Sequence, residues 1–132
     1  MTSTEAHPSR AERNRAIVRA CYQEFFVHRR LDALAALIHE EFVQHSPDAP
    51  SGRDAYLAHL EEAAFNGGSC DIQLVIADGD YVAVHHHLTL RGDDGPGLAV
   101  VDLWRLEDGK LVEHWDVEQP VPEPSRVPNG MF

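Results

Sequence analysis

The fold class of this chain is decided by residues 70–119, CDIQLVIADGDYVAVHHHLTLRGDDGPGLAVVDLWRLEDGKLVEHWDVEQ. Apolar and β-branched side chains recur with a period of two over 70–77, 81–91, 97–107 and 110–119, which is the pattern of β-strands. The separators DGD, GDDGP and EDG are rich in turn-forming residues and are typical of hairpins. The stretch therefore predicts four antiparallel strands that follow one another along the chain.

The residues before this stretch predict helices. Ser9 and Glu12 have the S-x-x-E spacing of a helix capping box. Apolar residues then recur every three or four positions until residues 27–30, VHRR. This is the apolar stripe of an amphipathic helix, so the first helix is expected to begin at Ser9 and end near VHRR.

Two shorter helices are expected to follow. The segment LDALAALI begins at Leu31, and its helix is predicted to run to about Glu40. A third helix is predicted over 53–65, RDAYLAHLEEAAF, with Ser51 and Asp54 as its N-terminal cap. Three helices followed by an antiparallel sheet indicate an α+β protein.

We expect a cone-shaped α+β barrel, in which the three N-terminal helices pack on one face of a curved, mainly antiparallel sheet. The open end of such a cone is a natural pocket for a small molecule. Residues 1–132 are expected to form a single domain, with a flexible N-terminus at 1–8 and a proline-rich arm at 120–132.

Charge, cysteine content and hydropathy give expectations for the partners of the protein, the state of its thiols and its compartment. The chain has 11 Lys and Arg against 22 Asp and Glu, a formal charge of −11, so neither nucleic acid nor a membrane is an expected partner. Cys21 and Cys70 are far apart and lack a CxxC spacing, which favours reduced thiols. With no signal peptide and no apolar run of about 18 residues, a cytoplasmic protein is expected.

Asp102 is the strongest candidate for a functional residue. Its neighbours on the same face of the predicted strand are apolar: Leu98, Val100, Trp104 and Leu106. An ionised carboxylate there is costly, so the group is expected to be paired or to have a raised pKa. Such carboxylates are often functional, although a purely structural pairing with a histidine is the alternative.

The next hairpin decides which residues accompany Asp102. A three-residue EDG loop would place His114 opposite Asp102 and bring Asp116 to the same face. A two-residue Asp108–Gly109 turn would instead place Trp115 opposite Asp102. We prefer the first hairpin because it gathers the polar residues on one face and leaves Trp115 outside the pocket, near a dimer contact.

Three consecutive histidines lie on the preceding strand. Alternation places His85 and His87 on one face and His86 on the other. Matching of apolar faces favours His86 as the neighbour of Asp102, whereas clustering of polar groups favours His85 and His87. The residues alone leave both registers open.

Three segments resemble a known family: FVQHSPDAPSGRDAY at 42–56, VVDLWRLEDGKLVEHWDV at 100–117 and NGMF at 129–132. They are similar to SnoaL-like polyketide cyclases, within the nuclear transport factor 2-like superfamily that also contains ketosteroid isomerases. The resemblance runs from the first helix to the last residue. It implies a homodimer with a deep, cofactor-free pocket for a hydrophobic small molecule. The implied chemistry is enolisation of a carbonyl compound, followed in the cyclases by intramolecular aldol closure.

The resemblance also implies roles for individual residues. It places the family's acid/base aspartate at Asp102 and an oxyanion donor of the isomerases at Tyr22, while their general base aligns with His45. The QHSP form and the His-x-His pair favour His85 and His87 as pocket-facing. The expected catalytic residues are then Asp102, His45 and His85. The expected substrate contacts are Tyr22, His87, Trp104, His114, Asp116 and Tyr56.

Two other functions remain open at this stage. His85 and His87, with Asp102 or His45, have the residue types of a Zn²⁺ or Fe²⁺ site, although no metal is expected from the resemblance. A non-catalytic ligand-binding module is the second alternative, because a fold does not determine a function. Bound metal in protein purified without a nickel column would separate the first alternative from the others.

Overall fold

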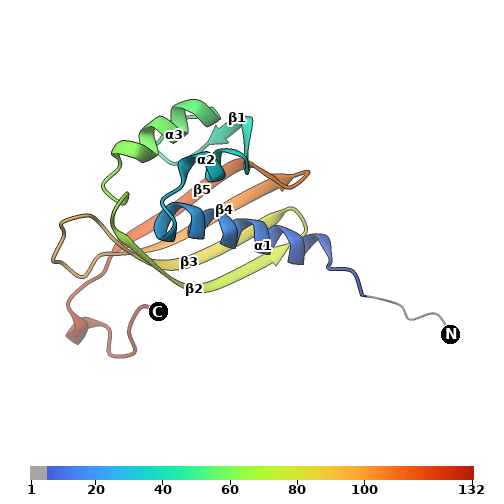
Figure 1. The fold of residues 1–132 in the computed structure, drawn as a ribbon. Helices are drawn as coiled ribbons and strands as arrows, with labels where there is room; N and C mark the ends of the chain where they lie inside the picture. The colour runs from blue at the N-terminus through green and yellow to red at the C-terminus, as the bar shows by residue number, and fades with distance from the viewer. Residues whose placement is uncertain (1–5) are drawn as a thin grey trace.

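The computed structural model describes residues 6–132 as an α+β fold, with three helices and a curved five-stranded sheet (Figure 1). Residues 1–5 of the expected flexible N-terminus, 1–8, lie outside the described residues. The helices are α1 (Arg10–Tyr22), α2 (Leu31–Ala35) and α3 (Arg53–Glu62), with a π-helical turn at Gln23–Val27 and a 3-10 turn at Pro124–Arg126. The strands are β1 (Ile38–Gln44), β2 (Ser69–Asp78), β3 (Tyr81–Thr89), β4 (Leu98–Glu107) and β5 (Lys110–Pro120).

The sheet has the strand order β1-β5-β4-β3-β2. The four strands from β2 to β5 are antiparallel as predicted, and β1 pairs parallel with β5. The helices lie against one face of the sheet, which we call the inner face, and the core forms between them (Figure 1). The opposite face is called the outer face below.

The start of α1 confirms Ser9 as the N-cap, which is one half of the predicted capping box. The backbone N–H of Glu12 donates to Ser9 Oγ at 3.1 Å, and Ser9 Oγ lies 3.2 Å from Glu12 Oε1. The apolar stripe then packs Val18, Cys21 and Phe25 into the core. Because the π-helical turn continues α1 to Val27, the predicted end near VHRR is also confirmed.

The second predicted helix is wrong beyond Ala35, because residues 38–44 form strand β1. Ile38 and Phe42 are buried on the inner face, and their spacing of four is compatible with either a helix or a strand. The strand is stabilised by the last strand of the chain: the N–H of Leu111 in β5 donates to the carbonyl of Leu37 at 2.8 Å. This long-range pairing overrides local helix propensity.

The predicted cap of the third helix is also wrong. The N-cap is Gly52, with a φ of 86° and no side-chain cap. Ser51 Oγ instead accepts a hydrogen bond from the N–H of Gln44 at 2.9 Å, and the Asp54 carboxylate accepts one from Arg53. The Ser51 hydroxyl thus attaches the loop before α3 to the end of β1.

The β4–β5 hairpin differs from the preferred prediction. Its turn consists of two residues, Asp108 and Gly109, whose φ angles of 48° and 78° have the signs of a type I′ turn. The register then shifts between Arg105 and Leu106, and Val112 is the extra residue of a β-bulge. The three-residue loop is therefore wrong.

Because of the bulge, His114 and Asp116 nevertheless face the pocket as predicted. A shift of one residue reverses which side chains face inward. As a result His114 and Asp116 share the inner face with Asp102, while Trp115 pairs with Leu103 on the outer face. The position of Trp115 outside the pocket is confirmed.

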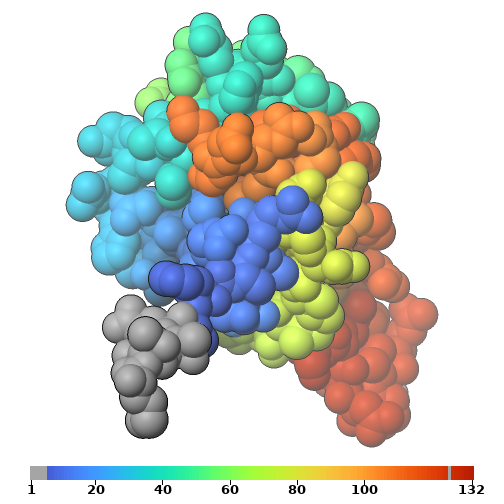
Figure 2. Space-filling model, turned by 90° about the vertical axis from the view of Figure 1, so that its right-hand side faces the viewer, coloured from blue at the N-terminus to red at the C-terminus, as the bar shows by residue number. Residues whose placement is uncertain are grey.

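The proline-rich arm ends on the outer face of β3. The ring of Phe132 stacks on the rings of His87 and His85, with centroid distances of 4.6 and 5.5 Å. Figure 2 shows the C-terminal residues in red, projecting from the main body of the molecule. Within 6–132, none of the helices is long and apolar enough to cross a membrane.

Both cysteines are free thiols, and burial raises the pKa of Cys21 and of Cys70 to about 12. The thiolate is the reactive form, so we expect native protein at pH 8 to react with a thiol reagent about 10³-fold more slowly than an exposed cysteine does. The measurement is absorbance after addition of Ellman's reagent, with urea-unfolded protein as the control. Rapid reaction of either thiol in the folded protein would contradict the burial.

Candidate functional site

A cavity of about 320 Å³ lies between the helices and the inner face of the sheet. Aromatic and aliphatic side chains make up most of its wall, among them Tyr22, Phe25, Tyr56, Leu60, Val100 and Trp104. Six of the polar side chains that reach it gather on four strands and the loop after β1: Gln44, Ser46, His86, Asp102, His114 and Asp116. Asp48, His59 and Glu118 also line the cavity. This composition is typical of a small-molecule site.

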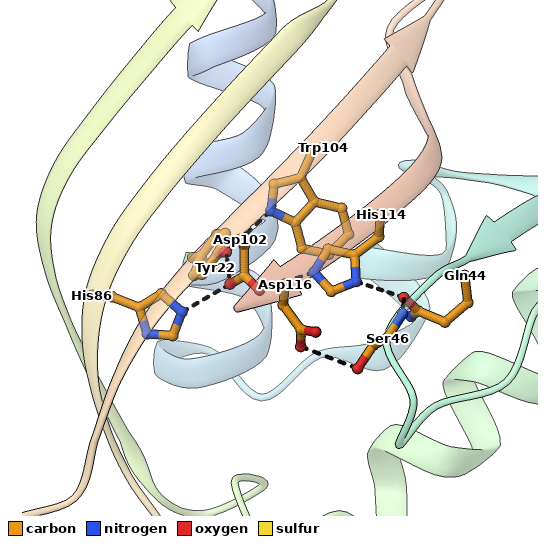
Figure 3. Close-up of polar contacts among 8 residues, drawn as sticks. All are labelled: Tyr22, Gln44, Ser46, His86, Asp102, Trp104, His114 and Asp116. Atoms are coloured by element: carbon orange, nitrogen blue, oxygen red, sulfur yellow. Dashed lines mark hydrogen bonds and ion pairs between the residues drawn. The ribbon is translucent and has the colours of Figure 1, made fainter. Parts of the chain in front are cut away.

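Asp102 on β4 is at the centre of a hydrogen-bond network (Figure 3). Its Oδ2 accepts one hydrogen bond from the Tyr22 hydroxyl and a second from His86 Nε2 at 2.8 Å. His114 Nε2 lies 2.9 Å from its Oδ1. Trp104 Nε1 donates to the Tyr22 oxygen at 3.1 Å, so the phenolic proton is directed at Asp102. Helix α1 and strands β3 and β5 thus supply one partner each.

The network holds Asp102 as a carboxylate. Burial alone would raise its pKa, but the hydrogen bonds from His114 and His86 outweigh burial and lower the pKa well below the ordinary value. Of the two outcomes predicted for Asp102, pairing is the one observed. Burial and the adjacent Asp102 charge raise the pKa of Tyr22 well above its ordinary value, so this residue stays a hydrogen-bond donor.

Gln44 and Ser46 extend the network from the other side of His114. Gln44 Oε1 lies 2.7 Å from His114 Nδ1 and also accepts the backbone N–H of Ser46 at 3.0 Å. The Ser46 hydroxyl donates to Asp116 Oδ2 at 3.1 Å. Sequence reasoning missed both residues. The available signal was alternation, because Gln44 and Ser46 flank His45 and so face the opposite way.

Two polar atoms of the site are buried without a hydrogen-bond partner among residues 6–132: His86 Nδ1 and Gln44 Nε2. Leaving a buried polar atom unpaired costs about 1–3 kcal/mol, and native proteins keep few such atoms. His86 contacts Asp102 and Gln44 contacts His114, which makes these atoms candidates for functional groups rather than packing defects.

The expectation that His85 and His87 face the pocket is wrong. His86 is only 3% exposed and lies on the inner face of β3, between Val84 and Leu88 in alternation. His85 and His87 point to the outer face, where both stack on Phe132. Burial of the apolar side chains of β3 decides this orientation, because the reverse would expose them to water.

His45 also lies outside the pocket, contrary to the expected role as a base. Its side chain is exposed, donates from Nε2 to Glu113 Oε2 at 2.6 Å and stacks on Trp115 at 4.9 Å between ring centroids. The preceding residue, Gln44, pairs with His114 on the inner face. The remaining predicted site residues do line the cavity: Tyr22, Tyr56, Asp102, Trp104, His114 and Asp116.

The structure does not bring together the metal site expected from His85 and His87: Asp102 lies on the other face of the sheet, and among the described residues His45 is not grouped with the two histidines as a possible ligand set. In the described chain, Asp102, His114 and Asp116 are the residues placed to bind one cation, with candidate ligand atoms within 4.8 Å of one another. Both ring nitrogens of His114 already face oxygen acceptors. The donor set therefore fits a hydrogen-bonded network better than an open metal site.

Several solved structures share this fold. A "putative ketosteroid isomerase" from Kribbella flavida is 25% identical, with a TM-score of 0.73 over 89% of this chain and 88% of that one. A "putative polyketide cyclase" from Bacillus cereus is 18% identical, with a TM-score of 0.68 over 83% and 76% of the two chains. A protein of unknown function from Cytophaga hutchinsonii, described as NTF2-like, is 14% identical, with a TM-score of 0.70 over 94% and 98%.

The sequence comparison identifies the family. No curated protein matches the chain significantly. The model of the SnoaL-like domain matches residues 18–114, which is more than half of the chain and includes Asp102 and its hydrogen-bond partners Tyr22, His86 and His114, whereas Asp116 lies just beyond the match. This chain therefore belongs to the SnoaL-like domain family.

Proposed function

We propose that the cavity binds a hydrophobic carbonyl compound and enolises it, using the histidine and aspartate groups around Asp102. The observation that carries the proposal is a carboxylate within hydrogen-bond distance of two buried histidines at the wall of an apolar cavity. Carboxylates and histidines in such surroundings are the usual acid–base groups of active sites. The family and its neighbours, named as an isomerase and a cyclase, support the same chemistry.

In the proposed mechanism His86 is the base. Three donors hold Asp102 as a carboxylate of low pKa, which makes it a weak base for a carbon acid. His86 donates its Nε2 proton to Asp102 and has an unpartnered lone pair on Nδ1. This arrangement resembles other aspartate–histidine pairs, in which the carboxylate orients the imidazole and stabilises the imidazolium that forms.

The proton and charge balance is simple. The proposed step requires the His86 ring to shift when the ketone binds, so that Nδ1, which is buried in the free protein, reaches the carbon next to the carbonyl and takes its proton. The C–H electrons form the enolate double bond, and negative charge moves to oxygen. Tyr22 is the proposed donor to that oxygen, which requires its single hydroxyl proton to turn from Asp102 Oδ2 to the enolate as charge develops there. In a cyclase-like reaction, the enolate carbon attacks a second carbonyl of the same molecule. His86 then returns the proton to the new alkoxide, so no cofactor is consumed.

The test uses 2-tetralone, an apolar bicyclic ketone with acidic hydrogens next to its carbonyl. Proton NMR in D₂O should show these hydrogens exchanging faster with the protein than in buffer, and tetralin, which lacks the carbonyl, should inhibit by occupying the cavity. If tetralone quenches tryptophan fluorescence but exchanges no faster than in buffer, the pocket is a binding module and the enzymatic proposal fails.

We also propose that a second copy of the chain covers the outer face. That face exposes a group of large apolar side chains from β2 to β5: Leu74, Ile76, Tyr81, Val101, Leu103 and Val117. Apolar patches of this kind usually mark interfaces, and one sheet face can pair with its own copy about a two-fold axis. The arm that ends at Phe132 borders this patch.

Leu103→Glu should therefore raise the dimer dissociation constant by about 100-fold, because a carboxylate would be buried in an apolar interface. Light scattering coupled to size exclusion at micromolar concentration measures the change. Val27→Glu is the matched control, since Val27 is equally apolar, is exposed and lies on the helical side of the molecule. A monomeric wild type, or dimers that survive Leu103→Glu, would count against the proposed interface.

A further inference from the structure

The amide of Gln44 has only one orientation compatible with its surroundings. The backbone N–H of Ser46 points at one of its two terminal atoms from 3.0 Å. A backbone N–H can only donate, so the atom that it faces must be the oxygen, Oε1, and the NH₂ group occupies the other position.

This orientation of the Gln44 amide determines whether Nδ1 of His114 is protonated. Nδ1 of His114 lies 2.7 Å from the same Gln44 oxygen. An amide oxygen accepts hydrogen bonds and never donates them, so Nδ1 must carry a proton. The remaining question is the state of Nε2, which lies 2.9 Å from Asp102 Oδ1.

The partners of Asp102 show that His114 Nε2 and Asp102 Oδ1 share one proton. Its Oδ2 already accepts from Tyr22 and from His86, so a single proton lies between Oδ1 and His114 Nε2. The two donors on Oδ2, Tyr22 and His86, stabilise the ionised form of Asp102, which leaves that proton on the histidine. Asp116 provides a second carboxylate, since its candidate atom lies within 4.8 Å of His114 and of Asp102.

We infer that Gln44 is a positioning residue that holds His114 as an imidazolium, paired with the Asp102 carboxylate. The pair is then neutral as a whole, and His86 remains the unprotonated base. Its catalytic consequence rests on the proposed function: with Asp116 a carboxylate in either case, an imidazolium at His114 leaves one negative charge fewer beside the enolate anion than a neutral His114 would. The protonation state of His114 does not depend on any substrate.

Two substitutions separate the acceptor role of Gln44 from its volume. Gln44→Glu keeps an oxygen for the Ser46 N–H and for His114, whereas Gln44→Met keeps the length of the side chain and removes the acceptor. Nitrogen NMR of histidine-labelled protein at pH 7.5 reports whether each ring nitrogen is protonated, and the His114→Asn spectrum assigns the His114 signals. We expect both nitrogens protonated in wild type and in Gln44→Glu, and an unprotonated Nδ1 in Gln44→Met.

The exchange assay gives a second readout. Gln44→Met should slow tetralone exchange by about 10- to 100-fold, the usual loss when a residue that orients a catalytic group is removed. Gln44→Glu should restore much of the rate. Gln73→Met is the matched control because Gln73 is an exposed glutamine on β2, outside the cavity, and its exchange should be unchanged.

A neutral His114 in the wild-type protein would overturn the inference, as would an imidazolium that persists in Gln44→Met. If Gln44→Met fails to fold, the wild-type spectrum still decides, since a doubly protonated His114 supports the inference and a neutral ring contradicts it. Expected spectra with no tetralone exchange in any variant would support the role of Gln44 and reject the proposed enolisation, so the two failures are distinguishable.

Discussion

Replacing Asp102 by asparagine is expected to lower tetralone exchange by about 10²- to 10⁴-fold, the usual contribution of a positioned acid–base group. The change removes the carboxylate that orients His86 through Nε2 and stabilises its protonated form. It also removes the counter-charge of His114, so the neutral ion pair of the cavity is lost. The NMR exchange rate at saturating ketone measures the effect.

Folding should survive the Asp102→Asn substitution. The new amide oxygen can accept from Tyr22 and His86, and the new NH₂ can donate to a neutral His114 whose other nitrogen still donates to Gln44. An amide is also cheaper to bury than a charge. We therefore expect little change in Tm. If the melting temperature falls by several degrees while exchange is preserved, Asp102 stabilises the fold and has no part in catalysis.

The second large effect concerns stability. Phe42→Ala should lower the free energy of unfolding by about 3–5 kcal/mol, the typical result of deleting a fully buried aromatic ring. Phe42 on β1 is 1% exposed and packs against Tyr56 of α3 and Trp104 of β4, with centroid distances of 4.9 and 6.3 Å. Loss of the ring would remove these contacts between β1, α3 and β4, all of which contribute residues to the cavity wall.

Urea denaturation followed by circular dichroism measures this loss, and the next residue supplies the control. Val43 is 41% exposed on the outer face of the same strand. Val43→Ala should change the free energy of unfolding by less than about 1 kcal/mol. Equal effects at Phe42 and Val43 would mean that β1 does not alternate as described.

The fold was predictable where local patterns decide structure. Alternation over 70–119 predicts β2 to β5, and the Ser9–Glu12 capping box predicts the start of α1; both are observed. Strand β1 was not predictable, because its residues satisfy helical and strand periods equally and its partner β5 lies about 70 positions later in sequence. The bulge at Val112 was likewise invisible, since no residue type requires it.

The site was predictable only in part. Asp102 could be found because a carboxylate among apolar side chains is costly without partners. Its histidine neighbour could not be chosen with the same argument: matching of apolar faces favoured His86, which is correct, whereas the family resemblance favoured His85 and His87. Register in a sheet is a property of the whole packed core, and this core buries Val84 with His86.

Neighbouring histidines on β3 allow the most direct test of the central claim. His86→Gln and His85→Gln replace a ring by an amide on opposite faces of one strand, and a glutamine at 86 can still donate to Asp102. We predict that His86→Gln slows tetralone exchange by about 10²- to 10⁴-fold and that His85→Gln leaves the rate unchanged. Wild-type exchange in His86→Gln, or an equal loss in His85→Gln, would contradict a pocket in which His86 is the base.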